Sequence, residues 1–162
     1  MPVVNGIEFF QYPAEEPLWG IRVDGTDLRA HAAWATREPW RPELEDEYED
    51  QERESAEFLW RQHDGLGVRD FAEDHFLSAA DRAPLLGCPC GIWQCWPLQA
   101  RIGVTSTTVT WSAFRQPYRE EWGELPIGPF EFDREAYEAA LAAPVLPAQD
   151  PLGEAPLALG VT

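Results

Sequence analysis

The sequence predicts a single α+β domain in which antiparallel strands, joined as hairpins, are covered by helices. A chain of 162 residues is long enough for one hydrophobic core and short for two. Two segments, 6–23 and 99–114, combine apolar runs with turn residues, and the segments between them carry helix caps and helical periodicity. We expect one globular domain over residues 1–143, followed by a Pro-rich tail over 144–162.

The N-terminal segment predicts a hairpin followed by a helix. Two apolar, aromatic-rich runs within 6–23 are separated by a turn that contains Pro13 and Pro17, and Asp24-Gly25 ends the second run. Thr26 or Asp27 then serves as the cap of a helix that extends to about Arg37.

The next segment predicts a break and then a long acidic helix. Residues 39–42, with proline at both ends, interrupt the first helix, and Pro42 suits the first turn of a second one. This second helix is expected to run from about residue 43 to 63. Its first part, 43–57, holds nine acids and one base, a net charge of −8.

The strongest strand signal lies in 99–114, after a mixed segment (64–86) that holds a short helix around Phe76. Apolar and polar residues alternate on both arms of the 99–114 hairpin, which predicts one buried face. That face carries Ile102, Val104, Val109 and Trp111.

The C-terminal part predicts a short helix and an irregular tail. Asp133 is the expected cap, Phe132 and Tyr137 form a hydrophobic staple across it, and Pro144 ends the helix. The tail contains several prolines and no periodicity, so its composition predicts flexibility.

Charge composition narrows the class of partner. Asp and Glu number 29 against 12 basic residues, so the net charge is −17. Such a surface disfavours direct contact with nucleic acid phosphates or anionic membranes and suits a basic protein partner. No apolar run reaches membrane-spanning length, the N-terminus lacks a signal-peptide pattern, and three cysteines cannot form a complete disulfide framework. We therefore expect a cytoplasmic protein with reduced thiols.

The cysteines form the most specific local pattern. Cys88, Cys90 and Cys95 give C-x-C-x4-C, and His75 is the nearest histidine that could complete a structural zinc site. The spacing differs from the usual C-x2-C, so plain core thiols are the preferred interpretation, with zinc or redox chemistry as alternatives. We expect no cofactor unless that zinc site forms, and no catalytic metal.

The acidic segment supports the first functional hypothesis, a non-enzymatic binding protein. Glu45, Glu49 and Glu52 are the candidate contacts for a basic partner, as in an inhibitor, an immunity protein or a nucleic-acid mimic. The alternative is a solvated face that keeps the protein soluble. No nucleotide-binding, metalloprotease or serine-hydrolase motif is present, so no catalytic residue is assigned.

The second hypothesis is a small metal-binding or enzymatic domain built on the cysteines and the loop 114–122. Arg115, Arg119 and Trp122 in that loop can bind an anion or a planar ligand, or can tie the loop to nearby carboxylates. This hypothesis predicts one pocket that includes Cys90 and Trp96 together with the loop residues. The first hypothesis predicts a convex acidic face.

Several strings in the second half resemble a family of small, uncharacterised, acidic bacterial proteins of actinobacterial type. They are the C-x-C-G-x3-C-W-P-L segment at 88–98, F-R-Q-P at 114–117 and G-P-F-E-F-D-R at 128–134. The resemblance implies that these segments belong to one domain, and it implies no activity. The family pattern has histidine where Tyr118 stands, which removes one possible ligand or base.

Overall fold

The computed structural model describes residues 4–161 and has the α+β architecture that the sequence predicts. Its helices are α1 (Leu28–Glu47), α2 (Glu52–Trp60) and α3 (Arg134–Ala142). One antiparallel sheet contains β1 (Ile7–Tyr12), β2 (Leu18–Val23) and β3 (Thr26–Asp27). The other contains, in this order, β4 (Ala80–Leu86), β5 (Leu98–Val104), β6 (Thr108–Arg115) and β7 (Phe130–Asp133).

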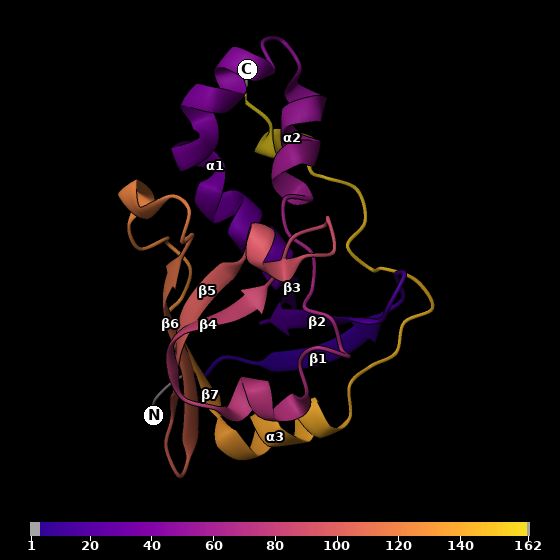
Figure 1. Ribbon diagram of the computed structural model, residues 1–162, viewed down its shortest axis with the longest axis vertical. Coiled ribbons are helices and arrows are strands. Elements are labelled where there is room, and N and C mark those ends of the chain that lie inside the picture. Colours follow the sequence, from indigo (N-terminus) through magenta and orange to yellow (C-terminus); the bar gives the residue numbers. More distant parts are fainter. Residues whose placement is uncertain (1–3, 162) are drawn as a thin grey trace.

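The helices occupy two ends of the molecule. Helices α1 and α2 stand side by side beyond the sheets, and α3 lies at the opposite end next to β1 (Figure 1). The main core lies between the two sheets and α3 and includes Phe9, Trp19 and Trp111. A second core joins α1, α2 and the tail. Within the described residues, no helix is long and apolar enough to cross a membrane.

Both predicted hairpins are confirmed. β1 and β2 pair with Phe9 opposite Ile21, and β5 and β6 pair with Ile102 opposite Trp111. Ile102, Val109 and Trp111 are buried as the alternation predicts, and Val104 is half-buried against the same core. Asp133 caps α3 by accepting a hydrogen bond from the N–H of Ala136.

Three strands were not predicted from the sequence: β3, where only a helix cap was expected, β4 and β7. β4 follows a 3₁₀ turn at 73–77 in the segment that looked mixed, and it carries Pro84. A proline fits there because β4 is an edge strand with one neighbour. β7 is only four residues long, too short for its alternating Phe130 and Phe132 to stand out.

The predicted break at 39–42 is wrong, because α1 is one helix of 20 residues and passes through Pro39 and Pro42 without interruption. Each interior proline costs a helix about 3 kcal/mol, since one backbone hydrogen bond is lost. Trp40 and Leu44 become buried only if the helix continues, and burying each side chain contributes about 1.5–3 kcal/mol. The packing of this face against α2 therefore offsets the two prolines.

The predicted long helix over 43–63 is also wrong, because the chain reverses direction after Tyr48. Asp50 has a left-handed backbone (φ 58°), and α2 then begins at Glu52. The reversal lays α2 against α1, so that Leu59 and Trp60 pack on Trp40 and Leu44 in the second core. A continuous helix would leave those apolar side chains in water.

The tail packs on the domain, contrary to the flexibility that its composition predicts. Val145 exchanges backbone hydrogen bonds with β1, donating to Phe9 O at 3.0 Å and accepting from Gln11 N at 2.8 Å. Leu159 and Val161 are buried against α1 and α2. The tail contacts the domain through isolated residues without a regular spacing, so no sequence pattern predicts these contacts.

The course of α1 leads to a prediction at Pro42. Inside a helix, Pro42→Ala restores a backbone N–H that can donate to Glu38 O, and we expect a gain of about 2 kcal/mol in unfolding free energy. At a helix start the same change would leave stability unchanged or lower it, because proline suits that position. Urea unfolding of the parent and the variant measures the difference, and a loss of stability would contradict the continuous helix.

Candidate functional site

The cysteines lie in a loop, residues 88–97, between β4 and β5, which we call the cysteine loop. Gly87, just before it, exchanges two backbone hydrogen bonds with Asp64, at 2.7 and 3.0 Å. A side chain at Gly87 would meet the Trp93 Cβ at 2.9 Å, so the loop can fold back only over a glycine. Gly91 has φ +92° and completes the reversal.

The fold of this loop brings the three thiols together. The sulfur atoms of Cys88, Cys90 and Cys95 all lie within 4.8 Å of one another, and none forms a disulfide. Cys88 is half-buried, and the other two are exposed. The preferred interpretation of plain core thiols therefore does not describe Cys90 and Cys95, which lie at the surface.

Cys88 and Cys90 differ in how readily they lose a proton. Burial raises the pKa of Cys88 to about 12. A backbone hydrogen bond with Ile92, followed by the hydrogen bond with Cys88, lowers the pKa of Cys90. Of these two, Cys90 is therefore the thiol that more readily becomes a thiolate and attracts a cation or an electrophile, and Cys88 gives up its proton only to a strong competitor.

His75, the fourth ligand that the sequence suggested, is not in this group. Its Nε2 lies 2.8 Å from the carbonyl oxygen of Pro84, and its ring packs on Phe71 and Phe76. His75 therefore joins the 3₁₀ turn at 73–77 to β4.

A different histidine, His63, supports the loop. Its Nδ1 lies 3.1 Å from the carbonyl oxygen of Trp96 and 3.4 Å from that of Gly87, so one donor bridges the two ends of the cysteine loop. Burial lowers the pKa of His63 to about 4, so the ring is neutral at physiological pH. No sequence pattern indicated this role, because His63 is far from the cysteines along the chain.

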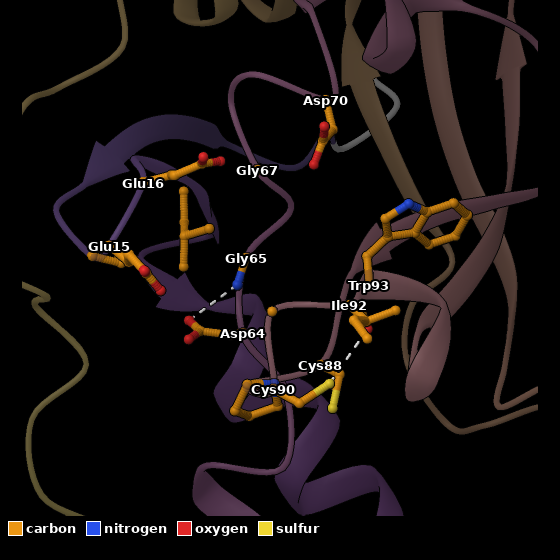
Figure 2. Close-up of a pocket in the computed structure, with 14 residues that line it drawn as sticks. Glu15, Glu16, Asp64, Gly65, Gly67, Asp70, Cys88, Cys90, Ile92 and Trp93 are labelled. Atoms are coloured by element: carbon orange, nitrogen blue, oxygen red, sulfur yellow. Dashed lines mark hydrogen bonds between the residues drawn. The ribbon is translucent and has the colours of Figure 1, made fainter.

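Two of the thiols face a cleft of about 520 Å³, the thiol cleft, formed by residues 14–18, 64–70 and 88–93. Its lining includes four carboxylates, from Glu15, Glu16, Asp64 and Asp70. Figure 2 shows the sulfurs of Cys88 and Cys90 next to each other, with Glu15, Glu16 and Asp64 across the cleft. Thiols and carboxylates in one cleft make an electrostatic environment that attracts cations.

Asp64 is fixed in this cleft by a buried network. It accepts a hydrogen bond from the Tyr12 hydroxyl and lies 3.5 Å from a guanidinium nitrogen of Arg29. Burial alone would lower the pKa of Arg29, but hydrogen bonds with Asp27 and Asp150 outweigh it and the pKa is raised. Arg29 is therefore a permanent cation, and it anchors one wall of the cleft.

Arg119, in the loop 114–122, is held by contacts with other parts of the domain. Its guanidinium lies 4.6 Å from the ring centre of Trp40 and 5.3 Å from that of Trp122, and it pairs with both carboxylate oxygens of Glu43. Arg115 does not join this group and lies 3.9 Å from Glu120. Arg119 therefore ties the loop to α1, whereas the pair of Arg115 with Glu120 lies within the loop.

Cys90, Trp96, Arg115 and Trp122 do not lie together in either of the two clefts described for residues 4–161. Cys90 lines the thiol cleft, whereas Trp96 lines a second, mostly apolar cleft of about 310 Å³ between α1, α2 and the cysteine loop. Neither cleft includes Arg115 or Trp122 in its lining. We call the second one the aromatic cleft.

The three predicted acidic contacts lie in different surroundings. Glu45 is exposed and pairs with Arg41 at 3.2 Å. Glu49 is exposed in the turn after α1, and Glu52 is half-buried at the start of α2. Of these three predicted contacts, only Glu49 is fully exposed and forms no ion pair within residues 4–161.

Comparison of the chain with protein-family models, curated proteins and solved structures finds no match.

The buried, neutral His63 leads to a prediction about pH. Between about pH 6.5 and pH 4 the unfolded chain binds a proton at this histidine and the folded chain does not, so acidification through this window lowers stability. The slope from this group reaches about 1.4 kcal/mol per pH unit. His63→Gln cannot titrate, so unfolding free energies measured across the window should fall less steeply in the variant. Equal slopes in parent and variant would contradict a neutral, buried His63.

Proposed function

We propose that the protein binds a thiophilic divalent cation, with zinc as the first candidate, through Cys88, Cys90 and Cys95. The observation that supports this proposal most directly is the mutual approach of three unoxidised sulfurs to within 4.8 Å. Zn–S bonds of about 2.3 Å in a tetrahedral arrangement separate the sulfurs by about 3.8 Å. Movements of about 1 Å in an exposed loop therefore suffice to close the site.

The site supplies three protein ligands. No histidine or carboxylate among the described residues lies within the same group, so the fourth position of a tetrahedral ion is open to water or to a further ligand. The thiol cleft lies beside this position and its carboxylates favour the cation. The proposal is therefore an accessible metal site, distinct from the closed four-ligand zinc site that His75 would have completed.

The metal proposal predicts a specific dependence on residues. Reconstitution of the reduced protein with Zn²⁺ should give near one ion per chain, and Co²⁺ should give sulfur-to-metal charge-transfer absorption. Cys95→Ser should weaken binding by at least tenfold, because one of three thiolates is lost. His75→Gln is the matched control and should bind like the parent. Substoichiometric metal in the parent, or loss of metal in His75→Gln, would refute the three-thiol site.

The same proposal predicts proton release. The thiol of Cys88 is protonated at neutral pH because burial raises its pKa to about 12, and it must lose that proton to bind metal. The apparent zinc affinity should therefore rise with pH, and calorimetry in buffers of different ionisation enthalpy should detect released protons. Affinity that is independent of pH would exclude Cys88 as a ligand.

A second candidate function, engagement of a basic protein, is supported by the unpaired acids on 43–57. Among residues 4–161, only three of the nine acids of this segment form an ion pair: Glu43, Glu45 and Glu57. The other six acids lie at the end of α1, in the turn after it and at the start of α2, and they are Asp46, Glu47, Glu49, Asp50, Glu52 and Glu54. Like charges concentrated in this short stretch repel one another. A cationic partner would relieve this repulsion.

Charge removal tests the second candidate. The triple variant Glu47→Gln, Glu49→Gln, Glu54→Gln keeps helix propensity and removes only charge, so it should unfold at a higher temperature at low salt. It should also bind a basic partner purified from the host more weakly, by at least tenfold. The control, Glu124→Gln with Glu135→Gln, removes exposed charge elsewhere. Equal binding by parent, triple variant and control would leave the acidic face as a solubility feature.

A further inference from the structure

The aromatic cleft is a binding surface that neither hypothesis from the sequence included. Its walls are Trp40 from α1, Phe58 from α2, and Pro89 and Trp96 from the cysteine loop. The Trp40 and Phe58 rings meet edge to face at 5.0 Å, and those of Trp40 and Trp96 are 5.6 Å apart. Side chains from three segments far apart in sequence thus form one apolar hollow.

The polar atoms of these walls are already satisfied. The indole N–H groups of Trp40 and Trp96 both donate to Oε1 of Gln62, at 3.1 and 3.2 Å. The Gln62 amide nitrogen donates to Thr36 Oγ1 and to Leu59 O. The hollow therefore has little to offer a polar ligand group and favours an apolar one.

The charge around the cleft indicates what kind of peptide segment would carry this apolar group. Glu47 lies two helical turns from Trp40 on the same side of α1, and Glu54 lies one turn from Phe58 on α2. Both carboxylates are exposed and form no ion pair within residues 4–161. Arg61 is the cationic residue that lines the cleft, and it is already paired with Glu57 and donates to Gly153 O. Unneutralised negative charge thus flanks an apolar hollow.

We propose that the aromatic cleft binds a basic peptide segment of a partner protein, with one bulky apolar side chain in the hollow and flanking Lys or Arg residues against Glu47 and Glu54. The proposal rests on the second candidate function and adds the anchor that charge alone cannot supply. Buried aromatic contacts provide most of the affinity of such interfaces, whereas exposed charges set the approach and the partner class. The volume of about 310 Å³ suits one large side chain.

The experiment uses blocked pentapeptides as probes. The test peptide has a central tryptophan between two arginines on each side, one control has alanine at the centre, and a second control replaces the arginines with glutamates. Calorimetry measures affinity to the full chain at low salt. We expect the test peptide to bind at least tenfold more tightly than either control, and the advantage over the glutamate peptide should shrink as salt rises.

Variants and spectra locate the binding. Phe58→Ala should weaken binding of the test peptide at least tenfold. Trp34→Ala is the matched control, because Trp34 is an exposed residue of α1 outside the cleft. Because Phe58→Ala could disturb the second core, NMR of the parent provides an independent readout. The indole N–H signals of Trp40 and Trp96 should shift on titration, and that of buried Trp111 should not.

The outcomes separate the two ideas. Equal affinity for the tryptophan and alanine peptides overturns the anchor and leaves the acidic-face function standing. Equal affinity for the arginine and glutamate peptides overturns the basic segment, and with it the second candidate function. A dimer in sedimentation experiments that Phe58→Ala dissociates would show that the cleft holds a second copy of the chain and would overturn the proposal.

Discussion

The buried guanidinium of Arg29 is the interaction on which the arrangement of the site depends. It is 3% exposed and donates to Asp27 at the start of α1 and to Asp150 in the tail, while its pairing with Asp64 extends to the thiol cleft. Removing one partner of a buried ion pair costs about 3–5 kcal/mol, because the other charge is left unpaired in a low dielectric. Asp64 in turn pairs its backbone with Gly87, where the cysteine loop begins. One side chain thus links the first helix, the tail and the segment that positions the thiols.

How much the sequence revealed depended on how local the determining contacts are. The two hairpins and the cap at Asp133 were predictable because alternation and capping act over a few residues. The path of α1 through Pro42 was not, because it is decided by burial of Leu44 against α2 and the tail. The same holds for the site. The cysteine spacing was visible, but the carboxylates and His63 around it arrive from distant segments that no periodicity connects.

Helices α1 and α2 together carry a local excess of negative charge, which is neutralised only in part. Arg119 neutralises Glu43, and its guanidinium also lies within 6 Å of the ring centres of Trp40, Trp96 and Trp122. A cation over aromatic faces is stabilised by about 0.5–2 kcal/mol, more when it is partly desolvated. The pairing with Arg119 neutralises the carboxylate of Glu43, and the carboxylates of Glu47 and Glu54 remain exposed to solvent. Two of the tryptophans around Arg119, Trp40 and Trp96, also line the aromatic cleft. These two side chains thus serve the second core and the aromatic cleft together.

The two clefts are not independent, because Cys88 and Pro89 line both of them. A change that moves these residues toward the other two thiols also moves one wall of the aromatic cleft. Linkage then requires that any effect of an ion at the thiols on peptide affinity be matched by an equal effect of the peptide on ion affinity. The sign depends on whether the closed loop narrows or opens the hollow between Pro89 and Phe58. The clamp by His63 holds both ends of this loop and so restricts the movement to the residues between them, where the sulfurs and Pro89 lie.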